Sequence, residues 1–262
     1  MSALILITAA MVGAIIASFL NVVISRGPRA WGLVEPEGKP KGLAFPPSQC
    51  ESCGVHLKPW QLIPIVSYLQ LNGQCANCGA KIGIRHFYVE LLGVSAALLA
   101  VSTYGLSPEG IAAAVFLFFL IALACIDFER EFLPDALTLP LTALGVIAAA
   151  AGAGPSLMQS LIGGALGGGG LWLIATSYKA IRGNEGLGGG DVKLVAAAGA
   201  WLGPFALPFI LLGASVSALL LLSAQVLLGQ RASLEGTTEL RFGPFLAAAM
   251  AAVMLLKPYA PL

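Results

Sequence analysis

Charged side chains are scarce in this sequence. Only 10% of its 262 residues are Asp, Glu, Lys or Arg, whereas 58% are hydrophobic, and the mean hydropathy is +0.88. Because a soluble globular domain carries about 25% charged residues, this composition excludes an ordinary water-soluble globular protein. It predicts an all-α protein that crosses a membrane several times.

Histidine is scarcer still, with His56 and His86 as the two examples in the chain. Both lie in the polar stretch 26–87, so no apolar segment has a histidine that could activate a serine nucleophile. The sequence also contains no His-Glu-x-x-His motif. Zinc metalloproteases of that type and histidine-dependent serine hydrolases within the membrane are therefore excluded.

Long apolar runs are abundant. With the N-terminus outside, eight spans leave every basic residue except Lys257 on the cytoplasmic side, as the positive-inside rule requires. The first span is a retained helix and not a cleavable signal, because no basic residue precedes it. The sixth is short and ends at Gly203-Pro204, so a partial or tilted helix is the alternative there. The expected spans lie near residues 3–25, 88–105, 109–126, 136–152, 156–178, 191–203, 205–228 and 242–256.

Four of the five cysteines form two CxxC pairs, Cys50 with Cys53 and Cys75 with Cys78. A glycine follows each pair and allows the turn to close with positive φ. This spacing lets both thiolates of a pair face one tetrahedral ion, and four thiolates leave no open position for water. Because cytoplasmic thiols stay reduced, we predict one structural zinc ion and no disulfides, with an iron-sulfur centre or a redox pair as the alternatives.

Two carboxylates stand at the ends of apolar segments, where a charge is costly and indicates a function. Asp127 follows the apolar run 111–126, and Asp191 follows the glycines 188–190. Two expected crossings separate them, so both lie at the same face of the membrane. Two carboxylates held close together share a proton, so one can take a proton from water while the other donates one. The pair therefore predicts an acid-base hydrolytic site.

Residues beside these acids have expected roles of their own. Gly188 and Gly190 would let an extended substrate backbone approach Asp191. Lys193 either biases the acid pair electrostatically or is an ordinary basic residue of the inner face. Pro134 breaks the preceding helix and starts the next one. The glycines between 163 and 170 are expected to let helices pack closely and not to bind a nucleotide.

Taken together, these motifs closely resemble those of the bacterial type IV prepilin peptidases, which are aspartic membrane proteases of the Gly-x-Gly-Asp type. The resemblance covers nearly the whole chain. It implies an enzyme that cleaves the leader from prepilins and pseudopilins and then methylates the new N-terminal amine with S-adenosylmethionine. It also implies that Gly73, in the loop of the CxxC pairs, is among the determinants of methylation. The matching stretches are 18–24 with Arg26 and Pro28, the two CxxC pairs, Asp127 with 133–140, and 188–193.

We therefore expect three parts: a first transmembrane helix (1–25), a cytoplasmic zinc-binding loop domain (26–87) and a membrane protease core (88–262). The expected location is the bacterial inner membrane, with the zinc loop and the active site facing the cytoplasm. The expected partners are prepilin and pseudopilin substrates and the lipid bilayer, with no nucleic acid. The alternatives are a peptidase without methyltransferase activity and a proton-coupled transporter.

Overall fold

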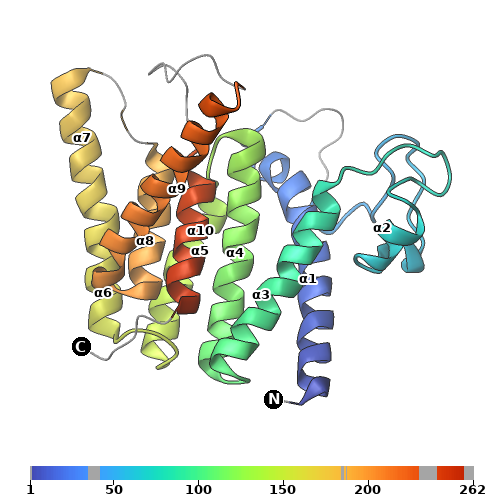
Figure 1. Ribbon diagram of the computed structural model, residues 1–262, viewed down its shortest axis with the longest axis horizontal. Coiled ribbons are helices and arrows are strands. Elements are labelled where there is room, and N and C mark those ends of the chain that lie inside the picture. Colours follow the sequence, from blue (N-terminus) through green and yellow to red (C-terminus); the bar gives the residue numbers. More distant parts are fainter. Residues whose placement is uncertain (1, 35–41, 184–185, 187, 230–240, 257–262) are drawn as a thin grey trace. The chain divides into compact units, whose positions relative to one another are not determined.

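The computed structural model describes residues 2–34, 42–183, 186, 188–229 and 241–256. In these ranges every regular element is a helix (Figure 1), which confirms the all-α prediction. The elements are α1 (Ala3–Ala30), η1 (Pro59–Leu62), α2 (Val66–Gln70), α3 (Arg85–Tyr104), α4 (Pro108–Arg130), α5 (Asp135–Ala150), α6 (Leu157–Ala165), η2 (Leu166–Gly170), α7 (Leu171–Arg182), α8 (Gly189–Leu202), η3 (Pro204–Ala206), α9 (Leu207–Leu227) and α10 (Gly243–Leu256).

Each of the eight predicted spans coincides with a helical segment. Among the described residues, five helical segments are long and apolar enough to cross a membrane: α1, α3, α4, α6 to α7, and η3 to α9. The helices α5 and α10 are apolar but shorter, and α8 has 14 residues. A protein with several membrane-spanning helices is therefore confirmed, whereas the number of eight crossings stays a prediction.

The helix α1 runs beyond the predicted end of the first span at residue 25. It reaches Ala30, so Arg26 and Arg29 lie on the helix and not in the loop that follows. Pro28 lies in the last turn, where the loss of one backbone hydrogen bond does not stop the helix at once. Four basic residues used in the topology prediction lie outside the described residues: Lys39, Lys41, Arg231 and Lys257.

The chain divides into two compact units, Met1–Ala122 and Leu123–Leu262, and α4 passes from the first into the second. In the first unit, α1 packs along α3. The two backbones approach closely because Gly93 has no side chain: a Cβ there would lie 2.3 Å from the Cβ of Ala17. Small residues at such a contact are typical of helix pairs in membranes.

In the second unit, α8 lies at the centre and contacts α5, α6, η2, α9 and α10. A Cβ on Gly199 of α8 would lie 2.0 Å from the carbonyl oxygen of Gly163 in α6. A Cβ on Gly167 of η2 would likewise lie 2.4 Å from the carbonyl oxygen of Val195. The prediction that the glycines between 163 and 170 serve close helix packing is therefore confirmed for Gly163 and Gly167.

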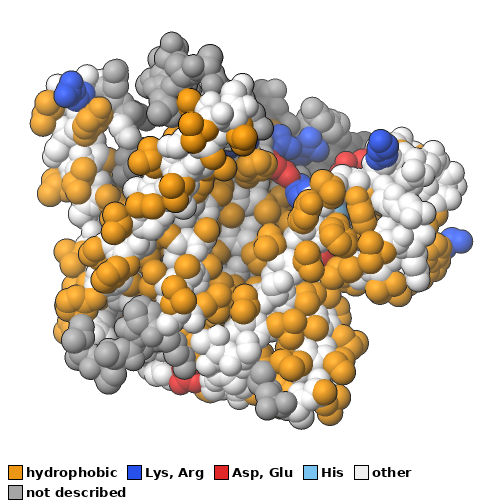
Figure 2. All heavy atoms as spheres, viewed as in Figure 1, with side chains coloured by type: hydrophobic (Ala, Val, Ile, Leu, Met, Phe, Trp, Pro, Cys, Tyr) orange, Lys and Arg blue, Asp and Glu red, His pale blue; other side chains and the backbone are white. Residues whose placement is uncertain are grey.

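Large apolar side chains also point outward from the helices. Ile174, Phe209 and Leu220 are 63%, 66% and 65% exposed, and hydrophobic side chains cover much of the face in Figure 2. Lipid solvates such a surface, while helices satisfy their backbone hydrogen bonds internally. The described helices thus match a membrane environment.

Candidate active site and metal centre

Asp127 lies near the end of α4, where the helix dipole does not stabilise a negative charge. Its side chain is only 7% exposed. The backbone N–H of Gly243, the first residue of α10, donates a hydrogen bond of 3.1 Å to its Oδ2. A buried carboxylate needs such a donor. Gly243 therefore holds one oxygen of Asp127 in a fixed place.

Asp191 lies in the first turn of α8, whose N-cap is Gly188. The positive end of the helix dipole makes this a favourable position for an acid. The side chain is partly buried, and it lies close enough to Asp127 for the two carboxylates to repel each other. The structure therefore places the two acids that the sequence singled out within electrostatic reach of each other.

The glycines before Asp191 pack tightly. A Cβ on Gly188 would lie 3.3 Å from Oδ2 of Asp191, and one on Gly190 would lie 2.9 Å from the Cβ of Leu133. Gly190 thus allows α8 to begin directly against the segment that joins α4 to α5. Leu187, between these glycines and the rest of the loop, lies outside the described residues.

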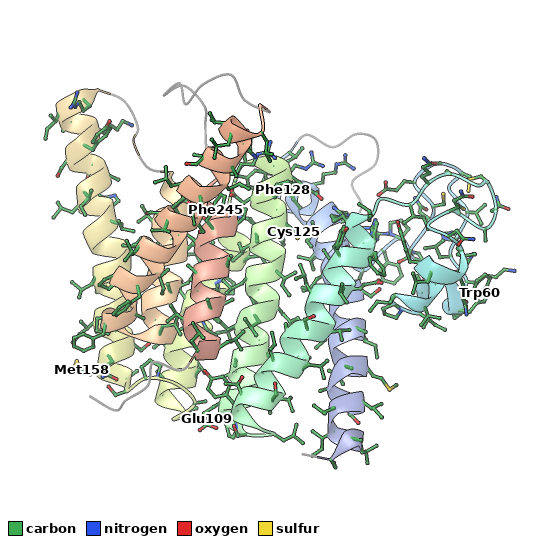
Figure 3. All side chains as sticks on the ribbon, in the orientation of Figure 1. Trp60, Glu109, Cys125, Phe128, Met158 and Phe245 are labelled. Carbon is green, nitrogen blue, oxygen red and sulfur yellow. The ribbon has the colours of Figure 1, made fainter. Side chains whose placement is uncertain are left out.

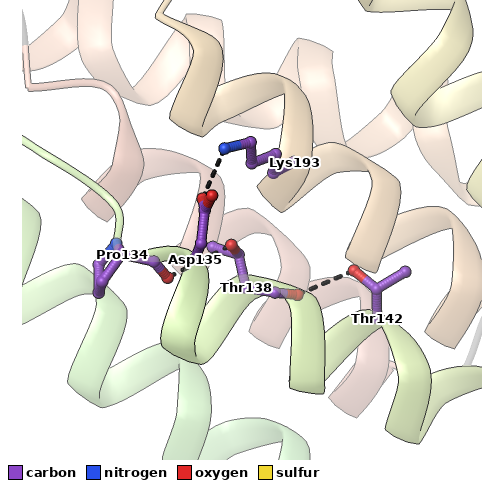
Figure 4. Close-up of polar contacts among 5 residues, drawn as sticks. All are labelled: Pro134, Asp135, Thr138, Thr142 and Lys193. Atoms are coloured by element: carbon purple, nitrogen blue, oxygen red, sulfur yellow. Dashed lines mark hydrogen bonds and ion pairs between the residues drawn. The ribbon is translucent and has the colours of Figure 1, made fainter. Parts of the chain in front are cut away.

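Pro134 directly precedes α5, and Lys193 of α8 faces Asp135, the first residue of α5 (Figure 4). The Nζ of Lys193 lies 2.5 Å from Oδ1 of Asp135. Pro134 is the N-cap of α5, and its carbonyl oxygen accepts the N–H of Thr138. Pro134 starts the next helix, as predicted. Lys193 is an ion-pair partner of Asp135, so it also fastens α8 to α5.

Sequence reasoning missed a second connection near Asp127, made by Arg241. Its guanidinium donates hydrogen bonds to Glu131 and to the carbonyl oxygen of Phe128, and it lies over the Phe128 ring at 5.5 Å. Figure 3 shows Phe128 at the end of α4 and Phe245 near the start of α10. Glu131 is thus an exposed acid with an arginine partner. The stretch 241–244, an arginine followed by Phe-Gly-Pro, is the signal that could have indicated this.

The four CxxC cysteines come together in the first unit. Their sulfur atoms all lie within 4.8 Å of one another, and Sγ of Cys50 and of Cys78 are 3.9 Å apart. Thiolates about 2.3 Å from a tetrahedral zinc ion are about 3.8 Å apart, so the cluster fits zinc. All four cysteines are free, so each sulfur atom is available as a metal ligand.

Each CxxC pair and the glycine that follows it form a turn, called a knuckle here. The two knuckles have the same backbone structure. In the first, the N–H of Cys50 donates to Val55 O, and Gly54 turns the chain with a φ of 71°. In the second, the N–H of Cys75 donates to Ala80 O, and Gly79 has a φ of 70°. Both glycines therefore close their turns in the left-handed region, as the sequence predicted.

Backbone amides favour the thiolate form of the first knuckle. The N–H groups of Cys53 and Ser52 lower the pKa of Cys50 to about 6. The backbone of Val55 and the side chain of Asn77 lower the pKa of Cys53. Because the thiolate is the form that binds metal, the knuckle is prepared for a cation.

Gly73, the predicted methylation determinant, lies between α2 and the second knuckle. Its φ is +66°, and a Cβ would lie 2.8 Å from the hydroxyl of Tyr68. The Tyr68 ring in turn lies 5.4 Å from the ring of Phe87 in α3. A side chain at Gly73 would thus disturb the contact between the zinc loop and α3.

Two family models match the chain. The Bacterial Peptidase A24 N-terminal domain matches residues 11–104, and the Type IV leader peptidase family matches residues 114–223. No solved structure is significantly similar to it.

Several proteins named prepilin leader peptidase/N-methyltransferase are similar to the chain. The protein of Neisseria gonorrhoeae is 42% identical over 79% of this chain and 78% of its own length. The protein of Burkholderia pseudomallei strain 1026b is 38% identical over 94% of this chain and 84% of its own. The Pseudomonas aeruginosa protein is 38% identical over 91% of this chain and 86% of its own.

Proposed function

Because the chain belongs to the type IV leader peptidase family, we propose that it cleaves the leader peptide from prepilins and pseudopilins and methylates the new N-terminal amine. The observation that supports this function best is the electrostatic repulsion between Asp127 and Asp191 in the second unit. A proton-coupled transporter would also need membrane acids, but the family membership favours the peptidase.

The cleavage reaction uses the two acids as a unit. The ionised carboxylate takes a proton from water, and the resulting hydroxide attacks the scissile carbonyl carbon. The protonated carboxylic acid donates its proton to the leaving amine as the C–N bond breaks. The Gly243 N–H on Oδ2 of Asp127 keeps that carboxylate in position through the reaction. No covalent enzyme intermediate is needed.

The segments beside the pair form the substrate-binding part of the site. Gly188 leaves the entry to α8 without a side chain, so an extended substrate backbone can lie near Asp191, whereas Gly190 lets α8 pack against Leu133. Pro134 is the N-cap of α5, and the ion pair of Lys193 with Asp135 joins the start of α5 to α8. Pro134 and Lys193 therefore affect cleavage indirectly, by positioning the segments that lie beside the two acids.

The substrate's own apolar helix explains a site at the membrane. A prepilin can lie among the helices with its polar leader in the cytoplasm, so that the bilayer positions the scissile bond. In this proposal residues 1–25 are the first membrane helix, 26–87 the cytoplasmic zinc loop and 88–262 the protease core. The protein resides in the bacterial inner membrane.

The cofactors follow from the two activities. Cys50, Cys53, Cys75 and Cys78 hold one structural zinc ion, which keeps the loop in shape and takes no part in hydrolysis. S-adenosylmethionine supplies the methyl group. Gly73 supports methyl transfer by keeping the loop in contact with α3.

The test is to incubate the purified protein in detergent with a prepilin, with and without S-adenosylmethionine, and to measure the product mass. We expect a shortened pilin in both cases, which is one methyl group heavier when S-adenosylmethionine is present. A shortened but unmethylated pilin would identify a peptidase alone. An uncut prepilin would contradict the proposed function.

A further inference from the structure

A polar layer interrupts the contact between α1 and α3 near the start of α3. The helices pair in antiparallel register, with Ala17 against Gly93 and Asn21 against the backbone of His86. Between these contacts, Ser18 of α1 hydrogen-bonds the carboxyl group of Glu90. The layer thus places a carboxylate inside an interface that is otherwise built from small apolar residues.

Glu90 is the acid of this layer, and it is only 9% exposed. Its Oε2 accepts a hydrogen bond of 2.6 Å from the backbone N–H of Ile65, in the zinc loop. Ile65 has a φ of 63°, which is unusual for a β-branched residue. The Ile65 amide and the Ser18 hydroxyl use two of the roughly four acceptor positions of a carboxylate. The proposed cleavage mechanism makes no use of this buried acid.

Asn21 contributes a second acceptor to the same layer. Its Nδ2 donates 3.1 Å to the carbonyl oxygen of His86, so its Oδ1 points elsewhere. That oxygen is buried, because Asn21 is only 5% exposed, and it has no hydrogen-bond partner among the described residues. An unpaired buried acceptor costs about 1–3 kcal/mol. The cost is removed if a donor binds there.

The two acceptors lie on facing helical turns. His86 and Glu90 are four residues apart on α3, and Ser18 and Asn21 are three apart on α1. Residues at these spacings have Cβ atoms about 5–6 Å apart. A small group with several N–H donors and a positive charge would satisfy both acceptors at once.

We propose that Glu90 and Asn21 form the binding site for the substrate amine in methyl transfer, and that Glu90 is its general base. This inference rests on the proposed methyltransferase function and adds to it the residues that receive the amine. Neither residue belongs to the aspartate pair that cleaves the leader.

The chemical step balances with these groups. The Glu90 carboxylate takes one proton from the new N-terminal ammonium, which leaves a neutral amine with a free electron pair. That pair attacks the methyl carbon of S-adenosylmethionine while the S–CH3 bond breaks and its electrons return to sulfur. The products are a methylated ammonium and the neutral thioether.

The unpaired oxygen of Asn21 favours an amine over other cations. A sulfonium group has a positive charge but no N–H to donate, so it would leave Oδ1 of Asn21 unsatisfied. A hard metal ion needs six or more oxygen ligands, and one carboxylate with one amide oxygen falls short of that number.

The test compares Glu90→Gln with the wild-type protein, using a synthetic peptide that begins at the mature pilin N-terminus. This peptide needs no cleavage, so methylation is measured alone, and cleavage is measured separately with a prepilin. If the wild-type protein fails to methylate the peptide, the methyltransferase part of the proposed function fails, and the amine site fails with it. The matched control is Glu109→Gln, in the first turn of α4 and at the opposite end of that helix from Phe128 (Figure 3).

We expect E90Q to cleave prepilin normally and to lose about 10- to 100-fold in kcat/KM for methylation near pH 6.5, since a charged hydrogen bond is lost. The deficit should shrink near pH 9, because an α-amino group loses its own proton at about pH 7.7–8.0. The groups that hydrogen-bond Glu90 are the neutral Ser18 hydroxyl of α1 and the Ile65 amide. The titratable groups that precede it on α3 are Arg85 and His86. E109Q should methylate as the wild-type protein does.

Two results would overturn the proposal. Normal methylation by E90Q excludes Glu90 as the base, and a deficit of equal size at both pH values would show that Glu90 only anchors the zinc loop. If E90Q does not fold, Asn21→Ala decides: we expect KM for the peptide to rise about 5- to 10-fold. An unchanged KM in N21A would contradict the amine site.

Discussion

The carboxylate of Asp127 packs directly against Gly243, where there is no room for a larger side chain. A Cβ at residue 243 would lie 2.6 Å from Oδ2 and 2.8 Å from Cγ of Asp127, so Gly243→Ala must push the carboxylate away. Because a displacement of about 1 Å can cost about 100-fold in rate, we expect G243A to cleave prepilin about 100-fold more slowly. The measurement is the initial rate of leader release by purified protein.

The matched control is Gly213→Ala in α9. There a Cβ would lie 3.5 Å from the Cβ of Ala249, which is an ordinary contact, so G213A should cleave normally. Wild-type cleavage by G243A, in a protein that keeps its metal, would show that Asp127 tolerates displacement and would contradict its role.

A site residue can be predicted from the sequence when it belongs to a recognisable pattern of neighbouring residues. Asp127 and Asp191 each interrupt an apolar segment, and the four cysteines have a spacing that chemistry explains. Gly243 has no such pattern, because its contact with Asp127 joins residues 116 positions apart. The same holds for Arg241 and Glu131, which are 110 positions apart. Contacts between residues so far apart in the sequence can be identified only once the fold is known.

At the scale of elements, α6 and α8 touch through their backbones. A Cβ on Gly163 would lie 2.2 Å from the carbonyl oxygen of Gly199, whereas one on the adjacent Gly164 meets nothing closer than 3.7 Å. Overpacking costs about 1–3 kcal/mol. We therefore expect Gly163→Ala to lower the midpoint of thermal unfolding in detergent, while Gly164→Ala leaves it unchanged. Equal midpoints for the two variants would contradict this packing.

The helices themselves are predictable because their apolar runs are long, whereas their ends depend on less regular features. All eight predicted spans are helical, yet α1 continues to Ala30 past the expected end at residue 25. The short α8 is buried among other helices, including α5, α6, η2, α9 and α10. Hydropathy alone therefore cannot tell a membrane crossing from a helix that is apolar because protein surrounds it.

At the scale of the whole molecule, we expect a bound zinc ion to stabilise the fold of the zinc loop. We expect elemental analysis of the purified protein to find one zinc per chain. Cys75→Ser should abolish zinc binding and make the loop sensitive to limited proteolysis, because metal binding contributes folding energy to such sites.

The control is Cys125→Ser, because Cys125 lies in α4, outside the four-cysteine cluster. It should bind zinc as the wild-type protein does. A folded, active protein without metal would rule out the structural zinc ion.

The most direct test of the account is the cleavage rate of Asp127→Asn and Asp191→Asn in purified protein that retains one zinc per chain. Each variant removes one of the two acids that share the work of proton transfer, so each should cleave prepilin at least about 100-fold more slowly than the wild-type protein. Cleavage at the wild-type rate by either variant would contradict the two-aspartate site.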